Sequence, residues 1–185
     1  MFRIPLWPVG LYDSIKVGRS RALGIPVIDF HELAAGKMAA LFSRSAARDL
    51  FDVHRSLTHG KFTRKCLRVA FVVYGAMNAK DWRNIRIESI HYNRKELKDE
   101  LLPLLRADSF SNSWDEWADT TEKECCDRLG IVLPLSDGEK EFLDRLLDYG
   151  EIRPAILTED EELADRIQNH PALEWKALNV RKHPG

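Results

Sequence analysis

The segment from His31 to Leu57 constrains the fold most strongly, because it joins a long run of helix-forming residues to charges at helical spacing. Its apolar positions are filled by Ala, Leu, Phe and Met, which suits a helix with one buried face. On one continuous helix, at about 100° per residue, Lys37, Arg44 and Arg48 would lie within about 20° of one line. Asp52 would lie roughly 60° from that line, and Asp49 about 120°.

Lys37 has Leu33 and Leu41 four residues away on either side, so its ammonium would be half desolvated and would favour a fixed anion nearby. The serines around Arg44 can divide the segment into two helices, with Ser45 as the N-cap of the second. From spacing alone, an ordinary surface ion pair such as Arg48 with Asp52 explains these charges better than a functional site does.

Two groups of short motifs resemble one protein family. The first group is Glu32-Leu33-Ala34, Lys37, Ala40-Leu41, Arg44 and Ala47-Arg48-Asp49-Leu50-Phe51-Asp52. The second group is Leu135-Ser136-Asp137-Gly138-Glu139, Phe142-Leu143, Gly150-Glu151-Ile152 and His170-Pro171-Ala172-Leu173-Glu174-Trp175-Lys176-Ala177-Leu178-Asn179. Both resemble the AbiEii/AbiGii nucleotidyltransferase toxins of bacterial toxin–antitoxin and phage-defence systems. The resemblance covers residues 24–57 and 130–183.

One expected motif is missing. Family members carry a Gly-Ser pair followed by a metal-binding aspartate ahead of this region, and residues 1–36 contain neither; Gly18-Arg19-Ser20 is not that motif. The sequence therefore resembles the C-terminal part of a family member. It offers no metal ligand, and a second chain could supply the missing N-terminal half.

The resemblance implies transfer of a nucleotide from an NTP to an RNA acceptor, with tRNA as the expected target and Mg²⁺ as the expected metal. Lys37 would bind the triphosphate as a catalytic residue, and Arg44 and Arg48 would support the phosphates. Asp49 is the expected catalytic carboxylate, and Asp52 is a second candidate. Such chemistry needs cations on the phosphates and carboxylates that hold a metal or polarise a hydroxyl. A cognate antitoxin is the partner that the family implies.

Charge is divided unevenly along the chain. Residues 1–68 carry a net charge of +7 and residues 96–165 a net charge of −14, although the whole chain is at −1. The basic part suits an anionic nucleotide or RNA. A basic stripe on the helix expected after Gly60, containing Arg64, Lys65 and Arg68, is a solvated face or, as the less favoured alternative, an RNA contact.

Composition indicates a soluble cytoplasmic protein. No apolar run approaches the ~20 residues that span a bilayer, and the N-terminus lacks a signal-peptide core. Three cysteines, two of them adjacent, make a poor disulfide framework and fit a reducing compartment. Zinc is not expected, because there is no Cys-x-x-Cys pair and His31-Glu32 is not followed by the second histidine that a zincin helix needs.

The remaining pattern predicts one strand followed by helices. The strand is Ile25–Ile28, and Asp29 with Glu32 forms a capping-box-like start for the helix after it. Later helices are expected at 61–78, 94–105, 114–129, 136–149, 158–169 and 171–180, with a turn-rich link at 108–113. Ser136 with Glu139 is expected to form a capping box for the helix at 136–149, which Gly150 would end as its C′ residue. Thr158 with Glu161 is expected to begin the helix at 158–169. The last helix is expected to bury Leu173, Leu178 and Trp175.

The expected fold is mainly α, a bundle of six or seven helices with one or two N-terminal strands. Residues 1–30 would be a remnant of the nucleotidyltransferase sheet, and residues 31–185 a helical domain carrying the Lys37–Asp52 motif. Two other functions stay open: a non-catalytic helical module that binds an antitoxin or an RNA, and one half of a split enzyme. An exposed apolar face beside Ile25–Ile28 would mark the split enzyme.

Overall fold

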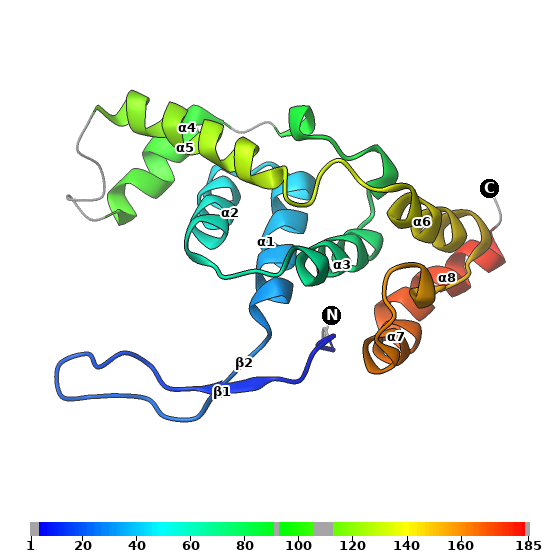
Figure 1. The fold of residues 1–185 in the computed structure, drawn as a ribbon. Coiled ribbons are helices and arrows are strands. Elements are labelled where there is room, and N and C mark those ends of the chain that lie inside the picture. Colours follow the sequence, from blue (N-terminus) through cyan, green and yellow to red (C-terminus); the bar gives the residue numbers. More distant parts are fainter. Residues whose placement is uncertain (1–3, 91–92, 106–112, 184–185) are drawn as a thin grey trace.

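The computed structural model describes residues 4–90, 93–105 and 113–183, and helices dominate it (Figure 1). Within these residues the longer helices are α1 (Phe30–Arg44), α2 (Ala47–His59), α3 (Arg64–Ala76), α5 (Trp114–Leu129), α6 (Asp137–Tyr149), α7 (Glu161–Gln168) and α8 (Pro171–Lys182). Short turns of helix are η1 (Trp82–Asn84), η2 (Ile87–Ser89), α4 (Arg94–Glu96), η3 (Leu97–Leu101), η4 (Leu102–Leu104) and η5 (Pro154–Ile156). Two strands, β1 (Gly10–Tyr12) and β2 (Ile25–Val27), form the sheet of this part of the chain. The predicted mainly α fold is confirmed.

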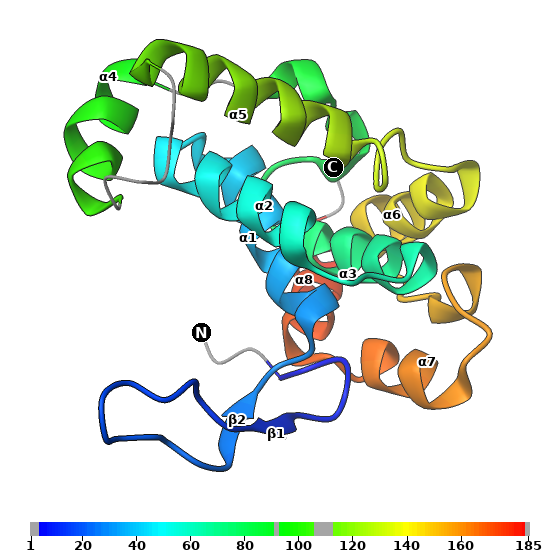
Figure 2. The same ribbon diagram turned by 60° about the vertical axis from the view of Figure 1, so that its left-hand side comes forward.

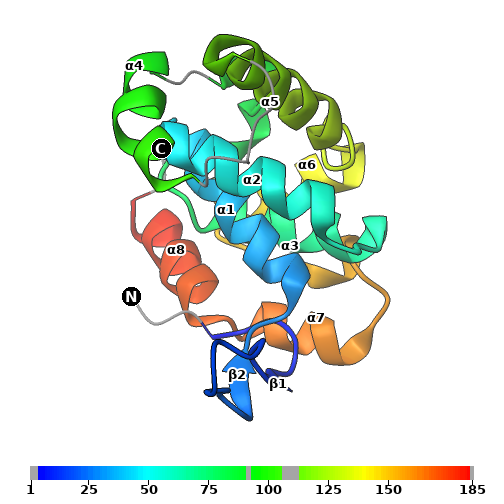
Figure 3. The same cartoon turned by 90° about the vertical axis from the view of Figure 1, so that its left-hand side faces the viewer.

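Helix α1 lies at the centre of the bundle. It packs against α2 and α3, α2 packs against α5, and α6 packs against α8. Figure 2 shows α5 lying across α2, and Figure 3 shows α1 beside α2. The rings of Phe42, Phe71 and Trp82 are fully buried and contact one another at centroid distances of 5.3–6.0 Å. Burial of these aromatic rings ties α1, α3 and η1 into one core.

Local signals set most helix ends. Ser136 accepts a hydrogen bond from the backbone N–H of Glu139, whose side chain accepts one from the N–H of Ser136, so the predicted capping box is present. Gly150 ends α6 in the left-handed conformation, with φ at 64°. The start of α7 differs from expectation, because Asp160 and not Thr158 accepts from the first turn. The predicted link at 108–113 lies outside the described residues, except for Ser113, which caps α5.

The corner between α1 and α2 also differs from the prediction. Ser45 is not the N-cap of α2; it ends α1 with φ at 56°, and its N–H donates to the carbonyl of Leu41. Ala46 precedes α2 and has no side chain able to cap it. The predicted division into two helices is nevertheless correct, since the left-handed residue turns the chain back and lays α2 against α1.

Helix α8 buries a different face from the one expected. Leu173 is fully buried, as predicted, and Ala172 and Ala177 accompany it. The prediction is wrong for the other two side chains, because Trp175 is 62% exposed and Leu178 is 43% exposed. Helix α8 packs against α6, and its buried residues are Ala172, Leu173 and Ala177.

The strands form an antiparallel ribbon that extends away from the helices (Figure 1). Leu11 pairs with Pro26. Because proline has no N–H, this can only be a non-hydrogen-bonded pair, and the backbone N–H and C=O of Leu11 point away from β2. The ribbon and its connecting loop carry many exposed apolar side chains: Leu11, Tyr12, Ile15, Val17, Leu23 and Ile25.

Candidate functional site

A cavity of about 600 Å³ opens along one face of α1. The α1 residues that line it are Glu32, Leu33, Gly36, Lys37, Ala39, Ala40, Ser43 and Arg44. The opposite wall consists of Tyr74 on α3 and the segment 77–79 that follows it, with Pro5 and Ile28 at the N-terminal end. At helical spacing, Lys37 and Arg44 lie along one edge of this face and the small residues lie across its middle. The volume is within the range of small-molecule sites.

Lys37 is held by a carboxylate of the neighbouring helix. Its Nζ donates to Oδ2 of Asp52 at 2.6 Å. Both side chains are partly exposed, at 41% for Lys37 and 29% for Asp52. Asp52 therefore pairs with Lys37 across the α1–α2 interface, and the predicted surface pair with Arg48 is not the one that forms.

Arg44, the last residue of α1, is also held by a carboxylate of α2. Its Nε and Nη2 donate to the two carboxylate oxygens of Asp49 at 3.1 and 2.8 Å. Asp49 is buried, with 3% of its side chain exposed, whereas the Arg44 side chain is 61% exposed. Hydrogen bonding to Asp49 raises the pKa of Arg44 above its usual value. Asp49 lies in the first turn of α2, where the N-terminal end of the helix favours a negative charge.

These ion pairs leave hydrogen-bond donors free for a ligand. Lys37 uses one of the three donors of an ammonium, and Arg44 uses two of the five donors of a guanidinium, within the described residues. The Lys37–Asp52 pair is partly exposed, and such pairs stabilise a fold by only about 0–1 kcal/mol, so an anion can compete for Lys37 at low cost. Asp49 is buried, so an anion would instead reach Arg44 through the donors that Asp49 does not use. The cavity edge thus presents two cations whose remaining donors are open to a ligand.

The structure places the other predicted residues differently. Arg48 is exposed on α2 and does not line the cavity. Arg64 and Lys65 are exposed at the start of α3, where they remain predicted RNA contacts. Arg68 takes part in the fold: its Nε and Nη2 donate to Glu139 at 2.8 and 2.5 Å.

Further bonds from Arg68 reach two backbone carbonyls, those of Ile131 and Pro134. Together with the ion pair to Glu139, they attach α3 to the connection between α5 and α6. The guanidinium of Arg68 is therefore committed to contacts inside the protein.

Glu32 is a cavity residue that the sequence did not reveal. It is fully buried, and its carboxylate accepts hydrogen bonds from the backbone N–H of Leu6 and Trp7 and from the hydroxyl of Tyr74. The capping-box expectation assigned Glu32 to the start of α1, where Asp29 alone accepts from the N–H of His31. A glutamate on the buried face of an apolar helix was the available signal, because a buried carboxylate needs donors.

Among the described residues, no three Asp, Glu, His or Cys side chains gather as metal ligands. In proteins Mg²⁺ is bound by one or two carboxylates together with substrate phosphates. A magnesium site of that kind needs fewer protein ligands than such a cluster. No helix of the described residues is long and apolar enough to cross a membrane.

Comparison with known proteins gives one family. The family model described as "Nucleotidyl transferase AbiEii toxin, Type IV TA system" matches residues 5–123, which is more than half of the chain. The match includes the cavity cations and the middle of the chain, and it ends before the resembling motifs at 130–183. No curated protein and no solved structure matches the chain. With the motif around Lys37 and Asp49 inside the matched region, this chain belongs to the AbiEii nucleotidyltransferase toxin family of type IV toxin–antitoxin systems.

Proposed function

We propose that the cavity binds the triphosphate of an NTP, and that the protein transfers a nucleotide from it to RNA, with tRNA as the acceptor class. The observation that carries this proposal is the position of Lys37 and Arg44 at one edge of the cavity. A carboxylate holds each of these cations, and each keeps further hydrogen-bond donors that the carboxylate does not use. A preorganised set of charged donors is what phosphoryl-type transfer requires of a protein. Family membership supports the reaction class.

Within this function, Lys37 and Arg44 bind the phosphates. Asp52 and Asp49 hold the two cations in place, and both stay predicted catalytic carboxylates. Asp52 is the more accessible of the two, since it is 29% exposed and its carboxylate accepts a hydrogen bond from Lys37 through one oxygen, whereas both oxygens of Asp49 accept from Arg44. Arg48, which lies outside the cavity, would contact the acceptor or the outer phosphates.

A divalent cation is implied by the family, and it would neutralise charge on the transferred phosphate. Because the described residues do not gather a set of ligands, we assign no step to it. The net charge of +7 in residues 1–68, with Arg64 and Lys65 exposed, supports contact with RNA. In this role the protein acts in the cytoplasm, as a phage-defence toxin restrained by a cognate antitoxin.

We also propose that residues 1–30 are the remnant of a nucleotidyltransferase sheet, and that a second chain supplies the N-terminal half. The exposed apolar ribbon beside Ile25 supports this, because such a surface is rarely left open in a monomer. On the outer edge of β1, the N–H and C=O of Leu11 have no partner among the described residues, whereas Pro26 has no N–H to offer on the outer edge of β2. A partner strand would therefore add to β1.

The alternative function is a non-catalytic helical module that binds an antitoxin or RNA. A module of this kind would use the exposed faces of the helices, such as the one with Trp175 and Leu178, and would not need the cavity cations. Substitution of those cations thus separates the two functions.

The test is transfer of α-labelled NTPs to total tRNA, with the chain alone and with any polypeptide encoded immediately upstream of the Met1 codon. Transfer is expected with the wild type, and Lys37→Met should abolish it while the protein stays folded. Arg55→Met is the matched control, because Arg55 is an exposed cation on α2. Equal transfer by Lys37→Met and wild type would refute the site. No transfer in either setting, with retained binding of tRNA, would favour the non-catalytic module.

A further inference from the structure

The cavity wall opposite α1 is a short segment that several elements hold in place. Residues 77–79 follow the end of α3. The side-chain amide of Asn78 donates to Ser43 on α1, and the Nζ of Lys80 donates to the carbonyl of Phe42 at 2.7 Å. The wall is therefore attached to the helix that it faces, and its position sets the width of the cavity.

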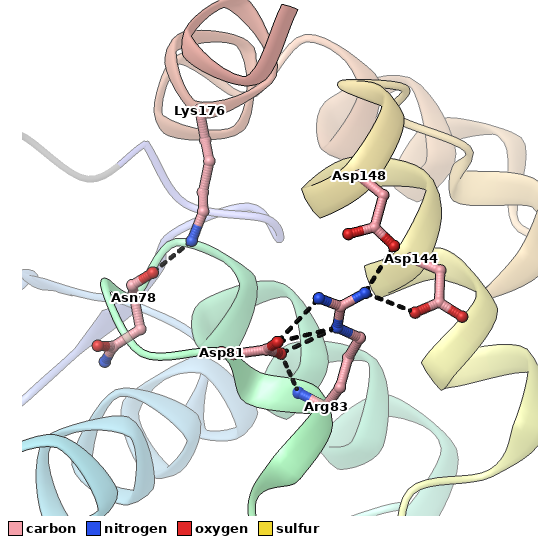
Figure 4. A network of polar contacts seen from close by, with 6 residues as sticks. All are labelled: Asn78, Asp81, Arg83, Asp144, Asp148 and Lys176. Atoms are coloured by element: carbon pink, nitrogen blue, oxygen red, sulfur yellow. Dashed lines mark hydrogen bonds and ion pairs between the residues drawn. The ribbon is translucent and has the colours of Figure 1, made fainter. Parts of the chain in front are cut away.

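A third attachment comes from α8. Lys176 reaches from α8 toward this segment, and its Nζ donates to the backbone carbonyl of Asn78 (Figure 4). Helix α8 lies outside residues 5–123, the part of the chain that matches the family model. A residue almost one hundred positions away in the sequence thus holds the peptide group of a cavity-lining residue.

Stability alone does not explain a lysine at this position. Burial lowers the pKa of Lys176, and the charge of Asp81 only partly offsets that effect. Within the described residues its ammonium forms no ion pair, and its direct partner is the neutral carbonyl of Asn78. An apolar side chain of similar length would be buried there at less cost.

The neighbouring hydrogen bonds of Arg83 attach a different segment. Arg83 on η1 donates to Asp81 and, across to α6, to Asp144 and Asp148 at 2.9 and 2.7 Å (Figure 4). These bonds attach the segment after the wall to α6 and do not reach Asn78. Two separate contacts therefore connect the C-terminal helices to this region, and one of them touches the cavity wall.

We propose that Lys176 is a positioning residue for the nucleotide pocket: by holding the carbonyl of Asn78, it fixes the 77–79 wall at the distance from α1 that an NTP requires. The inference rests on the proposed function, since it assigns a role in that same cavity. It makes the C-terminal helix part of the binding site without a direct contact between Lys176 and the ligand.

The experiment compares the full chain with three variants, Lys176→Met, Lys176→Arg and Lys182→Met. Lys182 is an exposed lysine of the same helix and serves as the matched control. Two quantities are measured: the affinity for ATP by calorimetry, and hydrogen exchange of the peptide that covers residues 77–83. Loss of one hydrogen bond at the wall should speed exchange there and weaken ATP binding about five- to tenfold in Lys176→Met.

Lys176→Arg should restore binding to within about twofold, because a guanidinium can donate to the same carbonyl. Unchanged affinity in folded Lys176→Met would overturn the inference, whatever the exchange shows. If the wild type itself does not bind ATP, the proposed function fails. In that case faster exchange in Lys176→Met would still support the positioning of the wall, and unchanged exchange would overturn it.

Discussion

Replacement of the buried glutamate on α1 tests how the N-terminal segment is attached. The carboxylate of Glu32 is fully buried and accepts three hydrogen bonds at 2.8–3.1 Å, from Leu6, Trp7 and Tyr74. Glu32→Gln keeps the size of the side chain and replaces one acceptor oxygen by a donor. At least one of the three donors must then lose its partner, and the bonds that remain lose their charge assistance.

The magnitude follows from these contacts. An unpaired buried N–H costs about 1–3 kcal/mol, and each remaining bond to a neutral acceptor is weaker by about 1 kcal/mol. A neutral amide is easier to bury than a carboxylate, which offsets part of the loss. We therefore expect Glu32→Gln to lower the free energy of unfolding by about 2–3 kcal/mol. For a chain of this size, the melting temperature should fall by roughly 5–10 °C.

Urea unfolding followed by circular dichroism measures this change. Glu174→Gln is the control, because Glu174 is exposed on α8 and the same substitution there should change stability by less than about 0.5 kcal/mol. Hydrogen exchange in residues 4–9 should also rise in Glu32→Gln. A free energy of unfolding within about 0.5 kcal/mol of the wild type would refute the view that this carboxylate anchors the N-terminal segment.

Three further predictions concern stability and reactivity. Gly75→Ala should lower the free energy of unfolding, measured by thermal unfolding, by about 3 kcal/mol, because the new Cβ would lie 2.1 Å from the fully buried ring of Trp82. A decrease below about 1 kcal/mol would contradict the close packing of Trp82 on Gly75. Arg68→Met should lower the free energy of unfolding by about 2–3 kcal/mol, because its ion pair with α6 is lost. Arg64→Met should change it by less than about 0.5 kcal/mol, since Arg64 is exposed. Equal effects of the two substitutions would show that the ion pair of Arg68 does not stabilise the fold. Burial raises the pKa of Cys125 to about 12, so little of its thiol is ionised at pH 8. Iodoacetamide should therefore modify Cys125 only after unfolding, and mass spectrometry of native and urea-treated protein measures this modification.

Local features of the fold were predictable from the sequence because their signals lie within a few residues of one another. The Ser136–Glu139 capping box and the glycine after α6 are of this kind. The α1–α2 division was predicted as well, but the wrong role was given to Ser45. Only the backbone conformation, with φ at 56°, shows that this serine ends the first helix instead of capping the second.

The geometry of the charged residues around the cavity was not predictable from the sequence. Lys37 and Asp52 are 15 positions apart, so on a straight helix they would be about 22 Å apart along the axis. The corner at Ser45 folds α2 back on α1 and brings them to 2.6 Å. The wall contact from Lys176 to Asn78 depends on how α8 packs, which no short-range pattern encodes.

Burial of the last helix was mispredicted for a related reason. Helical spacing shows which residues share a face, but it does not say which face meets a neighbour. In α8 the buried residues are Ala172, Leu173 and Ala177, and the larger Trp175 lies at the surface.

Calorimetric titration of ATP into the wild type and into the double variant Lys37→Met/Arg44→Met tests the central claim most directly, with Arg55→Met as the exposed-cation control. If the cavity edge binds a triphosphate, the wild type and Arg55→Met should bind ATP with similar affinity. The double variant, having lost two charge-assisted contacts, should bind at least about 100-fold more weakly. Equal affinity of the folded double variant and the wild type would contradict the assignment of this cavity to the nucleotide.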